Sequence, residues 1–236
     1  MKRFTCLRAL QRAAVLTAVM LAAPPPVQAQ TAPDAEQVAR YTGLHAAAQR
    51  GDLVQLDRLL AAKADVNVRD PHGRTALHVA TFAKQREVIR RLAKAGADLG
   101  ALEDDRYDAV TIAAVADDEQ TLATLLALGA SAKLTTSRYD GTALIAAAHL
   151  GHDGVVRQLI AAGAPLDHVN NLHWTALIEA IVLGDGGPRH IATLKALLAA
   201  GASTTLADRE GRTPLALARA RGYAEMVRRL EAAGAR

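Results

Sequence analysis

Hydrophobic residues from Tyr41 onward fall into pairs of short runs that glycines separate, and the clearest pair lies in Thr142–Ala164. Its first apolar run begins after Thr142, a residue type that caps helix N-termini, and stops at Gly151, a residue type that ends helices. The second run closes at Gly163. The pattern therefore predicts two short α-helices. Because helices this short are unstable alone in water, the pair must bury its apolar face against neighbouring pairs.

The paired runs recur along the chain at a nearly constant spacing. Most copies open on Thr-x-Leu, whereas the third opens on Asp108, which caps a helix as well as threonine does. The residues that close the copies are Lys63, Gly96, Gly129, Gly163, Gly201 and Gly234, at intervals of 33, 33, 34, 38 and 33 residues. In the last copy, Leu230-Glu231 replaces the usual Leu-Leu, as expected of a terminal unit that faces water. This period predicts a solenoid of stacked units.

Three further details make the unit resemble the ankyrin repeat. The helix start reads T-x-L-H at His45 and His78, Gly151-His152 matches the family's Gly-His between helices, and Asp65-Val66-Asn67 matches its exit sequence. The resemblance covers residues 41–236 and implies an all-α solenoid of about six helix-turn-helix repeats with hairpin-like finger loops. It places the repeats at approximately 41–70, 71–103, 104–136, 137–169, 170–207 and 208–236.

The first 29 residues differ from the repeats and predict a secretory signal peptide. Basic residues between Lys2 and Arg12 precede the apolar run Ala13–Ala23, and Val27-Gln28-Ala29 offers a small-residue cleavage site. The run's 11 residues fall short of the roughly 20 that span a bilayer, which argues against a membrane anchor. Residues 30–40 are polar and predict a linker that enters a helix near Ala35. We expect a periplasmic or secreted protein without stable membrane insertion after cleavage.

Loss of the signal peptide changes the charge and the cysteine content. Its four basic residues account for the whole excess of 28 basic over 24 acidic residues, so residues 30–236 are balanced in charge. We therefore expect no nucleic-acid binding, which needs a basic face. Cys6 is the only cysteine, so the exported chain has no disulfide and no thiol nucleophile. A monomer is expected.

Two irregular places invite other chemistry. The acidic segments Glu103–Asp105 and Asp117–Glu119 lack the D-x-D-x-D-G spacing of a calcium loop. The glycine-rich insertion Gly184–His190 lacks the G-K-[ST] of a phosphate-binding loop, and a neutral loop and a contact site both stay open. The eight histidines show no metal-ligand spacing, and no catalytic constellation stands out. We expect no cofactor, no metal and no enzyme.

The resemblance implies an extended concave face made of the fingers and the first helices. Side chains that packing does not fix project there, and Tyr, Trp and Arg are residue types that anchor protein interfaces. We expect a non-catalytic module that binds a partner protein on this face. The candidate residues are His72, Arg74, Phe82, Asp105, Tyr107, Arg138, Tyr139, His149, Leu150, Leu172, Trp174, Leu183, Arg209, Glu210 and Arg212.

The expected contact lies near the fourth and fifth copies, where Arg138, Tyr139, His149 and Leu150 have no packing role in the pattern. Whether aromatic residues of the fingers bind a partner or only stiffen neighbouring fingers stays open. Two other functions also stay open: an accessory stress or chaperone-like protein that protects an exported enzyme, and an effector delivered into a host cell. A repeat scaffold displays any surface, so the sequence does not name the partner.

Overall fold

The computed structural model describes residues 30–236, and the predicted signal peptide, residues 1–29, lies outside the described residues. Each of the six predicted repeats holds one inner and one outer helix. The inner helices are α2 (Gly43–Arg50), α4 (Ala76–Phe82), α6 (Ala109–Val115), α8 (Ala143–His149), α10 (Ala176–Val182) and α12 (Pro214–Ala220). The outer helices are α3 (Leu53–Ala61), α5 (Arg86–Lys94), α7 (Glu119–Ala127), α9 (Asp153–Ala161), α11 (Pro188–Ala199) and α13 (Ala224–Ala232). The predicted helical solenoid is confirmed.

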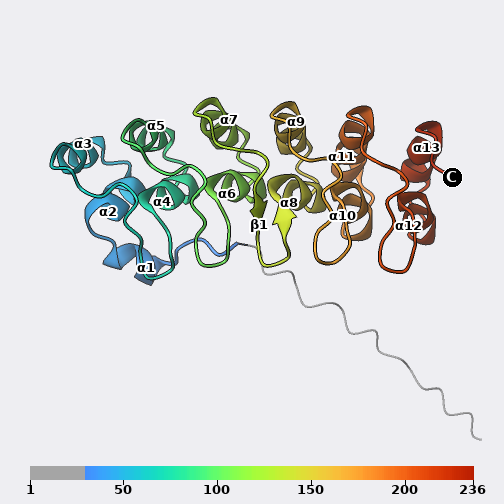
Figure 1. Cartoon of the computed structure of the whole chain (residues 1–236), viewed down its shortest axis with the longest axis horizontal. Helices are drawn as coiled ribbons and strands as arrows, with labels where there is room; N and C mark the ends of the chain where they lie inside the picture. Colours follow the sequence, from blue (N-terminus) through green and yellow to red (C-terminus); the bar gives the residue numbers. More distant parts are fainter. Residues whose placement is uncertain (1–29) are drawn as a thin grey trace, which may run out of the picture.

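The helix pairs stand side by side in chain order (Figure 1). The outer helices arch along the upper edge of the view, and the finger loops that precede the inner helices hang below. The concave face is therefore the surface formed by the fingers and the inner helices. Inner helices pack on the inner helices of adjacent repeats, and outer helices pack likewise on outer helices.

One hydrophobic core runs through all six repeats. Its members come from both helices of each pair, and in the fourth repeat Leu144, Val155 and Leu159 are fully buried. Burying such side chains stabilises the fold by about 1.5–3 kcal/mol each. Since neighbouring repeats supply much of the cover, each pair depends on the next, as the instability of short helices requires.

The predicted caps are found at most helix ends. The Thr142 hydroxyl accepts a hydrogen bond from the Ile145 amide at 3.3 Å, and the Asp108 carboxylate accepts one from the Thr111 amide at 2.9 Å. Thr42 makes no such bond. The residues that close the repeats have positive φ, which ranges from 58° at Lys63 to 93° at Gly129 and is 78° at Gly163. Glycine takes this left-handed conformation without steric strain, which explains its recurrence there.

Two short elements lie outside the six helix pairs: a helix near Ala35, as expected, and a strand pair. The expected linker at residues 30–40 contains helix α1 (Ala35–Arg40). A capping box between Asp34 and Gln37 caps the N-terminus of this helix. The finger before α8 forms a short antiparallel pair, β1 (Thr135–Thr136) with β2 (Gly141–Thr142). Among residues 30–236, no helix has the length and apolarity needed to cross a membrane.

Candidate functional site

Each finger is a tight turn that its own first side chain closes. In the finger before α4, one carboxylate oxygen of Asp70 accepts from the backbone amides of His72 and Arg74, both at 2.8 Å. Asn170 and Asp208 close their fingers in the same way. Burial acts to raise the pKa of Asp70, but the bonds from Arg74 and His72 outweigh it and hold the pKa below its usual range.

Successive fingers are linked through their backbones. The Asp104 amide donates to the His72 carbonyl at 3.2 Å, and the Ser137 amide donates to the Arg106 carbonyl at 2.8 Å. The Asn171 amide continues the series by donating to the carbonyl of Tyr139 at 3.0 Å. These bonds fix the spacing between fingers. The side chains on the concave face are therefore held by a rigid scaffold.

The structure places most of the predicted site residues within reach of solvent on this scaffold. Exposed members are His72, Arg138, Leu150, Arg209, Glu210 and Arg212. Half-buried members are Phe82, Asp105, Tyr107, Tyr139, His149, Leu172, Trp174 and Leu183. Several charged members are already paired within the protein, since Arg138 contacts Asp105 of the preceding finger at 2.5 Å, and Arg212 contacts Asp208 at 2.7 Å.

The prediction for Arg74 needs correction, because its side chain does not project from the surface. Arg74 is only 4% exposed. Its guanidinium lies 3.3 Å from the Asp70 carboxylate and donates to the Gln37 side chain at 2.8 Å. Gln37 belongs to α1, the helix within the expected linker. Arg74 therefore ties the N-terminal segment to the finger before α4 and is unavailable to a partner.

Two finger aromatics are partly buried and partly exposed. Trp174 packs against the hydrophobic core and stays partly exposed. Tyr107 is likewise half-buried, and burial raises the pKa of its hydroxyl. Large aromatic side chains that are anchored at one edge and open at the other suit interface contacts, because little conformational entropy is lost on binding.

Sequence reasoning missed Glu179, a carboxylate on inner helix α10 that is only 5% exposed. One of its oxygens accepts from the Asn170 side-chain amide at 2.9 Å, and the other lies 3.3 Å from Nδ1 of His149. A signal was present in the sequence. The other repeats carry apolar residues at this position, so an acidic residue there breaks the pattern.

The insertion Gly184–His190 packs against three other repeats. Nε2 of His190 donates to the His149 carbonyl at 2.9 Å, and Nδ1 lies 2.8 Å from the Asp185 carboxylate. Tyr223 of the sixth repeat donates to the Gly184 carbonyl at 2.8 Å. Arg189 reaches back to Asp117 of the third repeat at 2.7 Å. The insertion is therefore an ordered part of the solenoid.

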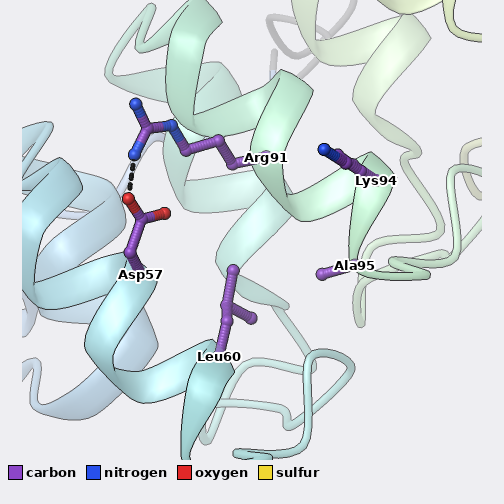
Figure 2. Close-up of a pocket in the computed structure, with 5 residues that line it drawn as sticks. All are labelled: Asp57, Leu60, Arg91, Lys94 and Ala95. Atoms are coloured by element: carbon purple, nitrogen blue, oxygen red, sulfur yellow. Dashed lines mark hydrogen bonds and ion pairs between the residues drawn. The ribbon is translucent and has the colours of Figure 1, made fainter.

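A pocket between outer helices α3 and α5 lies apart from the predicted site (Figure 2). Asp57, Leu60, Arg91, Lys94 and Ala95 line it, and the Asp57 carboxylate points at the Arg91 guanidinium, with which it forms an ion pair. The ion pair engages both of these groups, and Lys94 is the other charged side chain that lines the pocket. In residues 30–236, no group of three or more His, Cys, Asp or Glu side chains is placed to hold a metal ion.

Comparison with known proteins agrees with this architecture. A family model described as ankyrin repeats in three copies matches residues 11–103 and 110–208. The protein YahD of Escherichia coli K12, named as an ankyrin repeat protein, is 37% identical over 190 residues, which are 80% of this chain and 94% of YahD.

Solved structures show the same likeness. An ankyrin repeat domain from Acinetobacter baumannii aligns with a TM-score of 0.78 and 44% identity, covering 82% of this chain and 98% of that one. The ankyrin repeat domain of Bcl-3, described as a unique member of the IkappaB protein family, aligns with a TM-score of 0.75 and 27% identity, covering 84% and 88% of the two chains. The chain belongs to the ankyrin repeat family.

Proposed function

We propose that this protein is a non-catalytic binding module that holds a partner protein on its concave face. Ankyrin repeats are protein–protein interaction modules. The observation that carries the proposal is the row of exposed and half-buried side chains on backbone-linked fingers. A rigid scaffold lowers the entropy lost on binding, which favours specific recognition.

The centre of the face supplies the residue types that dominate interface energetics. Arg138 is exposed, while Tyr139 and Trp174 are half-buried on the adjoining fingers. Tyr, Trp and Arg are enriched among residues whose truncation costs 2 kcal/mol or more at interfaces. We propose that these three side chains anchor the partner, with exposed Leu150 of the neighbouring inner helix adding apolar contact.

The test is affinity capture from the native cell envelope, comparing the wild type with Trp174→Ala, Tyr139→Ala and Arg138→Ala. The expected result is a stoichiometric partner whose recovery falls at least tenfold with each variant. Arg157→Ala is the matched control, because Arg157 is an exposed arginine on outer helix α9, away from the fingers. A partner recovered equally well by all four variants would place binding elsewhere and refute the proposed site.

We further propose that the protein acts outside the cytoplasm, on the strength of the signal-peptide pattern in residues 1–29. Mass spectrometry of protein purified from the envelope and the medium should find a mature N-terminus at Gln30. An intact Met1 on the active protein would refute export by this route. A phenotype that appears only under stress, with no stable complex, would instead favour the accessory chaperone-like function, and protein detected in host cytosol would favour the effector.

A further inference from the structure

Resting on the proposed function, we propose that the concave face carries a subsite for a lysine or arginine side chain of the partner. The subsite is formed by Glu179, His149 and Asn170, at the junction of the fourth and fifth repeats. It would make binding depend on a basic residue that the partner presents among apolar neighbours.

Two residues of this subsite, Glu179 and His149, stand at positions that are apolar in most of the array. Counted from the helix cap, the place of Glu179 is filled elsewhere by Ala46, Val79, Ile112, Ala146 and Leu217. The place of His149 is filled by Phe82, Val115, Val182 and Ala220 in four repeats, and by the uncharged Gln49 in the first repeat. Solenoid packing therefore does not require a carboxylate or an imidazole here. Two adjacent departures from the pattern point to a role other than stacking.

The carboxylate of Glu179 has no permanent cation beside it. Its hydrogen-bond donor is the neutral amide of Asn170, at 2.9 Å. The imidazole of His149 lies 3.3 Å away and carries charge only when protonated. Among residues 30–236, no Lys or Arg nitrogen lies within 4.0 Å of this carboxylate, whereas half-buried Asp105 and exposed Glu210 both have an arginine partner. A nearly buried carboxylate without a cation is costly, and a partner's ammonium or guanidinium group would neutralise it.

The surroundings suit the apolar stem of a basic side chain. His149 is half-buried, and the next residue, Leu150, is 37% exposed. Leu183 follows Glu179 by one helical turn and is also partly exposed. Lysine and arginine pack their methylene groups on such apolar surface while the charged head reaches a polar group. The Glu179 side chain is 6% exposed, and the His149 side chain beside it is 24% exposed.

The insertion in the fifth repeat helps to hold the subsite. His190 donates from Nε2 to the His149 carbonyl at 2.9 Å, at the end of α8, and its Nδ1 lies 2.8 Å from the Asp185 carboxylate. The backbone that carries the His149 side chain is therefore held by the insertion. Since no other repeat has an insertion of this size, the unusual loop and the unusual carboxylate occur together.

The test uses an array of acetylated, amidated nonapeptides with apolar flanks, in which each of the 20 amino acids occupies the central position in turn. Binding is measured for the wild-type protein, for Glu179→Gln and for Glu87→Gln. Glu179→Gln removes the charge and keeps the shape, and Glu87→Gln is the control because Glu87 is an exposed acid on outer helix α5. The expected result is at least a tenfold preference of the wild type and of Glu87→Gln for central Lys or Arg, which Glu179→Gln loses while its melting temperature stays within a few degrees.

A second measurement uses propylguanidinium, an analogue of the arginine side chain, as a direct probe. Titration should shift the His149 imidazole resonances saturably in the wild type and not in Glu179→Gln, and uncharged butanol should have no such effect. Absence of a saturable shift in the wild type overturns the subsite. Peptides that bind with no basic preference, and that Trp174→Ala and Tyr139→Ala release, would also overturn the subsite while leaving the proposed function standing.

Discussion

The His78 side chain helps to cap the N-terminus of helix α4 and also joins two repeats. Its Nδ1 accepts from the Thr75 amide at 3.0 Å, and its Nε2 donates to the Ala101 carbonyl at 3.0 Å. These partners require the neutral tautomer with the proton on Nε2. Burial lowers the pKa of His78 from 6.5 to about 4, although the bonds to Ala101 and Tyr107 oppose the shift.

This lowered pKa predicts acid sensitivity. Between pH 6.5 and about 4, the unfolded chain binds a proton at His78 that the folded chain does not, so the free energy of unfolding falls as the pH falls through this window. The loss approaches about 3 kcal/mol at its lower end. Urea denaturation at pH 7.0 and pH 4.5 checks it. His78→Gln should be less stable at pH 7.0 and lose less on acidification; an unchanged pH dependence would contradict the assignment to His78.

A second effect at the residue scale concerns the backbone of the finger before α10. His173 has φ of 62°, at the position where other fingers have Gly73 with 70° and Gly211 with 73°. The His173 side chain is exposed. His173→Gly removes the strain of a left-handed backbone at a non-glycine residue, and this gain should exceed the larger entropy that glycine loses on folding. The substitution should therefore raise the free energy of unfolding by up to about 1 kcal/mol. Gly211→Ala should lower it by a similar amount. Thermal melts compare the two, and a less stable His173→Gly would reveal an unrecognised contact of the imidazole.

At the scale of elements, the helix pairs could be predicted because their signals are local. Thr142 and Gly151 bound one helix within ten residues, and the apolar run between them sets its buried side. Contacts between residues far apart in the sequence left no local signal of their partners, although the acidic residue Glu179 itself breaks the repeat pattern. Arg74 followed the pattern of an exposed finger residue, yet Gln37, 37 positions earlier, covers it. Glu179 lies nine residues from Asn170 in sequence and thirty from His149, and only the stacked fold brings the three together.

The contacts of the insertion predict how much two of its residues, His190 and Arg189, stabilise the fold. His190 is buried and makes close polar contacts through both ring nitrogens, so His190→Ala leaves the His149 carbonyl without its donor and should cost about 2 kcal/mol. Arg189→Ala removes a half-exposed ion pair with Asp117 and should cost less than about 1 kcal/mol. Urea denaturation gives both values. Hydrogen exchange should show the His190→Ala loss in α8 and the start of α11, and equal costs for the two variants would argue against the buried histidine as the main contact.

At the scale of the whole molecule, the concave face is a product of stacking as much as of its own residues. Finger follows finger through the amides of Asp104, Ser137 and Asn171, and Arg209 of the sixth repeat extends the series by donating to the Asn171 carbonyl. A substitution that destabilises one repeat should therefore also destabilise the repeats next to it. The six-repeat period revealed this architecture in the sequence, whereas the identity of the side chains that a partner meets depends on which of them the neighbouring fingers already engage.

The stacked arrangement predicts that the same substitution has different effects on unfolding in a central repeat and in the first repeat. Leu56 on α3 and Leu159 on α9 are both fully buried, so each Leu→Ala change should cost about 2–5 kcal/mol locally. Leu159→Ala lies in a central repeat and weakens the interfaces with the repeats on both sides. The urea transition of this variant should therefore broaden or split, because the two ends of the array unfold separately. Leu56→Ala strikes the first repeat, which has only one repeat neighbour, and should fray α2 and α3 while α9 to α13 keep their stability. Hydrogen exchange monitored by mass spectrometry at increasing urea resolves the helices. If Leu56→Ala removed protection from all six repeats together, the array would unfold as a single cooperative unit instead of a chain of coupled repeats.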